Sequence, residues 1–295
     1  MSLRALAVLL LMGTLAGMIN AAVGSGSLLT LPVLLALGVA PGTAVRTNTL
    51  GILFSTIGSV AGYRREIAAE RTAHRIGPLL ATTLVCSALG SCLLLVSPSE
   101  ALDVVVPVLI VLALMLVVSQ KRITRAIAAL RERRSAQAGA AEGAPGGAEN
   151  AQEGVPGSAD SAREGNAESA RGGMYTSPAL LASMGAASMY GGYFTAAQGI
   201  LYLGVLGAFT GRAMTSINAM KNLLSLLVNA TAVAVYLAAH WIWGAPIVWE
   251  AAAAIAIGAL AGGYGGSHLA KRLPEPAMRG VIVVVALVAL VRQVL

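Results

Sequence analysis

Four small residues interrupt the first apolar run of this sequence. Gly24, Ser25, Gly26 and Ser27 read Gly-Ser-Gly-Ser, and Asn20 lies four positions before them. Glycine lets a backbone turn sharply and approach another segment closely. A helix that begins just after such a break presents free N–H groups and the positive end of its dipole. The stretch therefore predicts an anion-binding site at a helix start, and a break used only for tight packing is the alternative.

A second polar group lies in the apolar segment 213–239. Amides and a hydroxyl are spaced 4, 3 and 4 residues apart, at Asn218, Asn222, Ser225 and Asn229. This spacing places them on one helical face, and Lys221 is adjacent to that face. An ionisable residue inside an apolar helix is a functional candidate because its burial is costly. The alternatives are a lysine that extends to the membrane surface and amides that only bond neighbouring helices.

The same features recur in both halves of the chain. A shift of 170 residues aligns three pairs of polar residues, Asn48 with Asn218, Ser55 with Ser225 and Ser59 with Asn229. The break "VGSGS" also has a counterpart, "YFTAAQG", in the second half. An internal duplication follows, with both breaks and both polar faces in one site. The candidate substrate-binding residues are Asn20, Gly24, Ser25, Gly26, Ser27, Thr47, Asn48, Thr195, Gln198, Gly199, Asn218, Lys221 and Asn222.

The composition predicts the elements that hold these residues. Of 295 residues, 57% are hydrophobic and 11% are charged, and the mean hydropathy is +0.77. Soluble domains carry about 25% charged residues, whereas blocks of about 17 to 25 apolar residues span a bilayer as helices. The net charge of +7 does not indicate nucleic-acid binding, because most Lys and Arg residues flank apolar segments. The sequence predicts an all-α polytopic membrane protein.

Ten apolar segments divide into two sets of five. They are 3–23, 28–37, 44–62, 76–96 and 102–119, then 177–193, 200–209, 213–239, 247–270 and 277–295. The predicted units are a first transmembrane repeat at 1–134, a linker at 135–172 and a second repeat at 173–295. The linker is rich in Ala, Gly, Glu and Ser and is predicted to be disordered, with a helical extension of the fifth segment leading into it.

The loop charges predict that the two repeats are inverted. The loop "YRREIAAERTAHR" carries four arginines, whereas its counterpart "HWIWGAPIVWE" carries no Lys or Arg. The next hairpin reverses this, since "SPSEALD" lacks Lys and Arg and "KRLPEPAMR" has three. Cytoplasmic loops carry the Lys and Arg excess, so we expect a cytoplasmic linker and both termini on the periplasmic side. A cleaved signal peptide at the N-terminus is the alternative reading of the first segment.

The first two segments of each half are expected to form a broken or re-entrant pair. The second segment, at 28–37 and again at 200–209, is too short to cross a bilayer. Inverted repeats with broken helices are typical of secondary transporters. Gly258, Gly262 and Gly266 predict close helix packing, either within the chain or in a homodimer. No metal motif, phosphate loop or paired nucleophile and base is present, so neither an enzyme nor a cofactor is expected.

The chain resembles the sulfite exporter TauE/SafE family of permeases. The matching stretches are "GMINAAVGSGSLLTLPVLLALGV" and "AVRTNTLGI" in the first half, and "MYGGYFTAAQGILYLGVLG" and "INAMKNLLSLLVNATAVAVY" in the second. The resemblance implies a permease of the bacterial inner membrane for small sulfur-containing anions such as sulfite and sulfonates. The chain departs from the family at its second break, where Thr195, Ala196, Ala197 and Gln198 replace a glycine-rich tip, and in its long linker.

Three functions remain open on the sequence. The first is a secondary transporter that moves a small sulfur-containing anion by alternating access. The second is an exporter of another small organic acid. The third is a membrane scaffold that transports nothing and acts through its cytoplasmic linker.

Overall fold

The computed structural model describes residues 1–22, 24–142 and 175–269, and every helix or strand in these residues is an α-helix. The ten helices are α1 (Leu3–Ala22), α2 (Ser27–Ala36), α3 (Pro41–Gly62), α4 (Arg64–Ala73), α5 (Gly77–Val96), α6 (Ser99–Glu142), α8 (Pro178–Phe194), α9 (Gln198–Thr210), α10 (Met214–Trp243) and α11 (Trp249–Leu269). The prediction of an all-α fold is confirmed for the described residues.

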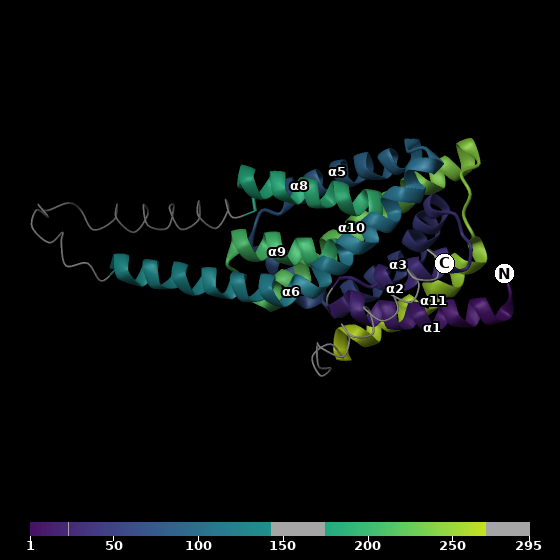
Figure 1. Ribbon diagram of the computed structural model, residues 1–295. Helices are drawn as coiled ribbons and strands as arrows, with labels where there is room; N and C mark the ends of the chain where they lie inside the picture. Colours follow the sequence, from purple (N-terminus) through teal and green to yellow (C-terminus); the bar gives the residue numbers. More distant parts are fainter. Residues whose placement is uncertain (23, 143–174, 270–295) are drawn as a thin grey trace, which may run out of the picture.

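Helices from the two halves of the chain pack against each other in pairs. α1 lies along α11 at one side of the bundle, and α5 lies along α8 at the other. α3 and α10 cross between these pairs and contact each other (Figure 1). The closely spaced glycines of α11 face α1, because a Cβ on Gly258 or Gly262 would meet the backbone of Leu10 or Thr14. These glycines therefore allow close helix packing within the chain, as predicted.

Helix length separates the membrane-crossing candidates from the short helices. In the described part of the chain, four helices are long and apolar enough to cross a membrane, namely α1, α5, the first part of α6 and α10. α2 has 10 residues and α9 has 13. At 1.5 Å per residue they span about 15 and 20 Å, well below the hydrocarbon thickness of about 30 Å. The two short segments predicted from the sequence are confirmed as α2 and α9.

The arginine-rich loop after α3 contains a helix that is not among the predicted apolar segments. α4 spans Arg64–Ala73 and buries Ile67 and Glu70. Tyr63, Ile67, Glu70 and His74 are spaced 4, 3 and 4 residues apart, which is the spacing of one helical face. The high charge of this loop hides the pattern from a search for apolar segments.

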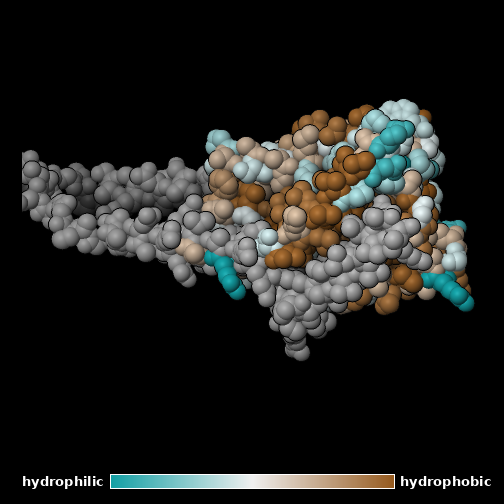
Figure 2. Space-filling view, in the orientation of Figure 1, coloured by the Kyte–Doolittle hydropathy of each residue, from teal (hydrophilic) through white to brown (hydrophobic). Residues whose placement is uncertain are grey.

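The outer surface of the bundle is hydrophobic along its flank. Figure 2 shows hydrophobic residues over the middle of one face and hydrophilic residues near its right-hand end. Leu89 of α5 and Val108 and Val118 of α6 are 56%, 60% and 65% exposed. Apolar side chains this exposed over whole helices are expected where lipid surrounds the protein.

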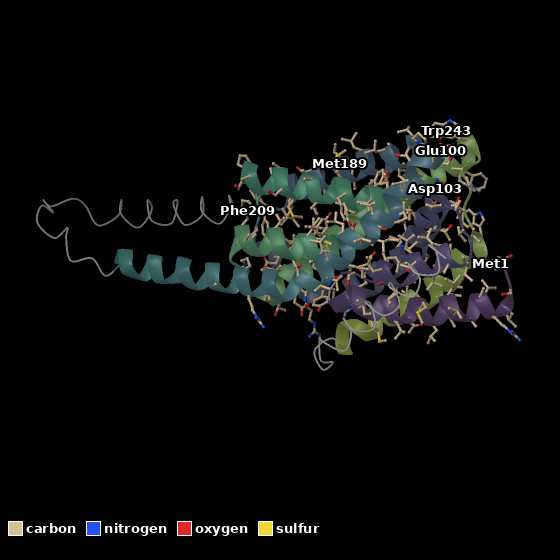
Figure 3. The ribbon with its side chains drawn as sticks, in the orientation of Figure 1. Met1, Glu100, Asp103, Met189, Phe209 and Trp243 are labelled. Atoms are coloured by element: carbon tan, nitrogen blue, oxygen red, sulfur yellow. The ribbon has the colours of Figure 1, made fainter. Side chains whose placement is uncertain are left out.

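The two ends of the bundle differ in composition. Met1, Glu100, Asp103 and Trp243 lie toward the right-hand end in Figure 3, whereas Phe209 lies toward the opposite end. We call the first the tryptophan end, since Trp241, Trp243 and Trp249 lie in or beside the α10–α11 loop. The start of α3 reaches this loop, because the Arg46 Nε donates to the Pro246 carbonyl at 3.1 Å. We call the opposite end, formed by α4 and the α9–α10 loop, the arginine end.

Parts of the predicted linker and of the second predicted repeat lie outside the described residues. α6 continues as a helix to Glu142, within the segment predicted as the linker. The remainder of that linker, 143–172, and the tenth apolar segment, 277–295, are not described by the structure.

Candidate functional site

The two helix breaks meet inside the bundle. The Gly199 backbone N–H donates to the Gly24 carbonyl at 3.2 Å, across 175 residues of sequence. Gly24 has a φ of +82°, a conformation that L side chains rarely adopt. A Cβ built on Gly24 would lie 2.6 Å from the Gly199 Cα. The backbones of the two breaks are therefore in contact, and glycine is required on both sides.

Lys221 lies beside this crossing and is fully buried, with 0% exposure. Its ammonium donates to the carbonyls of Asn20 at 3.4 Å and Ala21 at 3.3 Å, in the last turn of α1. These carbonyls form the negative end of the α1 dipole. The chain has no Asp or Glu before Glu66 and none between Tyr175 and Trp249. Helices α1, α2, α3, α8, α9 and α10 therefore offer this ammonium no carboxylate.

Two asparagines link Lys221 to the first half of the chain. The Asn222 Nδ2 reaches the Ala21 carbonyl at 3.5 Å, the same oxygen that Lys221 contacts. The Asn20 Nδ2 donates to the Ser55 Oγ of α3 at 3.2 Å. Asn20, Lys221 and Asn222, which were predicted as site residues from different halves, are thus brought together. The end of α1 is the element that joins them.

Several buried polar groups around the breaks have no protein partner. The Asn48 Oδ1 accepts a hydrogen bond from the Thr30 hydroxyl, but its Nδ2 has none. The Ser25 Oγ, at the start of α2, is also buried without a partner. Buried donors in proteins are normally satisfied, so these groups are ready to bind a ligand or water. Their preference for an acceptor matches the chemistry of an oxyanion.

The second break adopts an unusual backbone conformation without glycine at its tip. Thr195 and Ala197 have φ values of +54° and +59°, and they flank Ala196. The Tyr190 hydroxyl donates to the Ala196 carbonyl at 3.0 Å, and the Thr195 Oγ1 lies 3.4 Å from the Thr49 Oγ1. These contacts hold the tip although its residue types do not favour the conformation. The departure from a glycine-rich tip is therefore compensated by side-chain contacts.

Ala197→Gly is expected to stabilise the protein. A left-handed conformation costs an L-residue about 1 to 2 kcal/mol, and the greater freedom of glycine in the unfolded chain offsets about 0.4 to 1 kcal/mol of this. A net gain of about 0.5 to 1 kcal/mol should raise the melting temperature in detergent. Ala196→Gly is the control, since Ala196 is not among the positive-φ residues. A lower melting temperature for Ala197→Gly would contradict the prediction.

The remaining predicted residues lie in different surroundings. The Thr47 Oγ1 accepts a hydrogen bond from the Val248 N–H at 3.1 Å, so this side chain holds the α10–α11 loop. Gly26 packs against the Ala16 backbone, and Ser27 begins α2. Gln198 begins α9 and Asn218 lies in α10, and the side-chain oxygen of each is buried without a partner. Of this group, only Thr47 is directed away from the breaks by a specific contact.

Several residues that contact the site or its surroundings are not among the predicted site residues. Thr30 bonds to Asn48, and Thr49 lies within hydrogen-bond distance of Thr195. Both are polar residues inside apolar segments, and this feature of the sequence could have identified them.

A separate cluster lies at the arginine end. The Arg212 Nη2 donates to the Glu70 Oε1 at 2.6 Å, and the Tyr175 hydroxyl donates to the Oε2 at 3.2 Å. Glu70, Arg212, Tyr175 and His74 are called the Glu70 cluster below.

The arrangement favours binding of an anion. One buried cation, unpartnered hydroxyl and amide donors and the first turn of α2 lie around the crossing of the two breaks. The Leu28 and Leu29 N–H groups of α2 already donate to the Ser25 and Gly26 carbonyls, so the contribution of this helix start to anion binding is the positive end of its dipole. In the described residues no group of three or more His, Cys, Asp or Glu side chains could hold a metal ion.

Comparisons with known proteins identify the family of the chain. The family described as sulfite exporter TauE/SafE matches residues 9–292. Proteins described as probable membrane transporter protein YfcA, from Escherichia coli strains K12 and O157:H7, are each 23% identical over 283 residues, covering 96% of this chain and 87% of theirs. No solved structure gives a significant match. Because the family match covers nearly the whole chain, the chain belongs to the sulfite exporter TauE/SafE family of multi-pass membrane transporters.

Proposed function

We propose that the protein is a secondary transporter of small sulfur-containing oxyanions, such as sulfite or an organosulfonate, and works by alternating access. The observation that carries the proposal is Lys221, a fully buried ammonium whose recorded partners are two backbone carbonyls. A buried charge is costly unless it is paired. An oxyanion at this position supplies the missing negative charge, and the family assignment supplies the sulfur-containing class.

The surrounding residues divide the binding among them. The ammonium of Lys221 balances the substrate charge, and Asn222 and Asn20 hold the end of α1 that faces it. The Ser25 hydroxyl and the Asn48 amide donate to the substrate oxygens, near the positive end of the α2 dipole. Since Gly24 and Gly199 bring the two breaks into contact, a shift of one break moves the other.

Two inverted repeats supply the mechanical basis of the proposal. The first helix of each half packs along the helix formed by the fourth apolar segment of the other half, as α1 does with α11 and α8 with α5. The α10–α11 loop corresponds to the connection between α3 and α5, which contains α4. Trp243 lies toward one end in Figure 3, whereas α4 contacts Arg212, which follows Phe209 at the other end. Both features support an inverted arrangement. We place the arginine end and the linker in the cytoplasm and the tryptophan end in the periplasm of a bacterial inner membrane.

Single cysteines should report this orientation. In a chain with Cys86→Ser and Cys92→Ser, Ala73→Cys and Ser135→Cys are expected to react with an impermeant maleimide only from the cytoplasm. Gly244→Cys is expected to react only from the periplasm, because it lies at the opposite end of the bundle from Ala73. Permeabilised cells serve as the control, in which all three positions react. Labelling of positions 73 and 244 from the same face would contradict the inverted arrangement.

Counterflow in liposomes tests the transport function directly. Liposomes that contain the purified chain are loaded with one unlabelled anion. They are then assayed for uptake of labelled sulfite, sulfate, taurine, sulfoacetate or a carboxylate. We expect exchange of at least one sulfur oxyanion well above empty liposomes. Exchange of carboxylates alone would favour an exporter of another organic acid. The absence of any flux would favour a scaffold that acts through its linker.

A further inference from the structure

The Glu70 cluster joins segments that are distant in sequence at the arginine end. The carboxylate of Glu70, on α4, is 2% exposed. Arg212 precedes α10, Tyr175 precedes α8, and both donate to this carboxylate. The His74 Nε2 lies 3.7 Å from the same carboxylate, and the rings of His74 and Tyr175 meet edge to face at 5.5 Å. One residue of the first half therefore holds two segments of the second half.

Beneath the cluster, α4 covers the part of α10 that leads to the candidate site. Tyr63 and Ile67 pack on Ala219 in one apolar cluster. Ala219 lies between Asn218 and Lys221 on the same helix and has 0% exposure. The exposed face of α4 carries Arg64, Arg65 and Arg71. α4 thus lies between the surrounding solvent at the arginine end and the helix turn that bears the buried lysine.

The contact between Glu70 and Arg212 can be either formed or broken. Burial acts to raise the pKa of Glu70, but hydrogen bonds from Arg212, Ser216 and Tyr175 outweigh it, so the pKa lies below its ordinary value. The carboxylate is therefore charged at neutral pH. The Arg212 side chain is 36% exposed, but the Glu70 carboxylate is buried, so loss of Arg212 leaves a buried charge without its ion-pair partner. The ion pair is either formed, with α4 packed on α10, or broken, with water around both side chains and α4 displaced. A fully exposed ion pair would contribute little to keeping α4 in place.

We propose that α4 is the gate of the transport pathway at the arginine end, and that the Glu70–Arg212–Tyr175 contact is the latch that holds it closed. The inference rests on the proposed function, because alternating access requires each end to open in turn while Lys221 is fully buried in this structure. Opening separates α4 from Ala219, exposes the first turns of α10 and releases Arg212 from Glu70. The structure then represents the state closed at the arginine end.

Cysteine accessibility tests the latch without any assumption about substrate. The full chain, with Cys86→Ser, Cys92→Ser and Ala219→Cys, is placed in lipid nanodiscs and treated with a charged methanethiosulfonate reagent. Glu70→Gln is expected to accelerate modification of position 219 at least fivefold, because a neutral amide cannot hold Arg212 as an ion pair. Arg212→Met should do the same if Glu70→Gln expresses poorly. Glu66→Gln is the matched control, on the same helix but outside the cluster, and should leave the rate unchanged. Equal rates in Glu70→Gln, Arg212→Met and the control would overturn the latch.

A reversible cross-link tests the gate. Ile67→Cys and Ala219→Cys, which replace two side chains of one cluster, are joined in liposomes by a short bifunctional methanethiosulfonate. We expect [35S]sulfite counterflow to fall at least tenfold and to return after reduction. Full counterflow by completely cross-linked protein would overturn the gate. Failure of the reduced protein to carry any oxyanion would instead count against the proposed function, and the accessibility assay would still decide the latch.

Discussion

Lys221→Met is expected to weaken oxyanion binding at least tenfold, which corresponds to about 1.4 kcal/mol. Methionine keeps an unbranched apolar chain but removes the only charge on α10 between Met214 and Tyr236. The donors of Ser25 and Asn48 remain, so residual binding is expected. The measurement is a competition assay with labelled sulfite on purified protein, together with counterflow in liposomes.

Two variants separate the binding role of Lys221 from a purely structural one. Lys221→Arg should restore affinity only in part, because a planar guanidinium replaces a compact ammonium. Arg4→Met removes a cation from the exposed start of α1 and should leave affinity unchanged. Size-exclusion profiles show whether loss of the donor to the Asn20 and Ala21 carbonyls impairs folding. Wild-type affinity in a well-folded Lys221→Met protein would mean that the ammonium serves only to hold the end of α1.

The sequence predicted those parts of the site that follow from local spacing. The 4, 3 and 4 spacing predicted a polar face on α10, and the structure buries Asn222, Ser225 and Asn229 of that face together with the adjacent Lys221. The short apolar lengths of 28–37 and 200–209 predicted α2 and α9. Each of these features is a property of one helix, because helical periodicity and helix length depend only on the residues of a single segment.

Contacts between distant segments could not be predicted in the same way. The hydrogen bond from Gly199 to Gly24 and the ion pair between Arg212 and Glu70 join residues that no periodic pattern relates. Thr47 shows the same limit, since its position beside Asn48 does not reveal that its hydroxyl accepts a hydrogen bond from the Val248 N–H. Which neighbour a polar side chain meets depends on helix packing, which spacing along one helix does not determine.

Gly199→Ala is expected to have an effect comparable to the loss of Lys221. A Cβ at this position would lie 2.5 Å from the Gly24 Cα and 2.8 Å from the Gly24 carbonyl oxygen. Both neighbours are backbone atoms, so the two breaks must move apart. Overpacking of this kind typically costs about 1 to 3 kcal/mol, and it also lengthens the hydrogen bond between the breaks. We expect a lower melting temperature and a loss of at least tenfold in counterflow.

Gly77→Ala is the matched control, because a Cβ there has no heavy atom within 4 Å and the residue lies at the start of α5. It should retain wild-type melting and flux. Gly24→Ala should be more damaging than Gly199→Ala, since the positive φ of Gly24 adds about 1 to 2 kcal/mol of backbone strain to the same collision. If Gly199→Ala instead melts and transports like Gly77→Ala, the breaks are not in contact in the working protein. In that case the two halves of the site would have to be coupled through the other contacts between them, such as those of Lys221 and Asn222 with the end of α1 and that of α3 with α10.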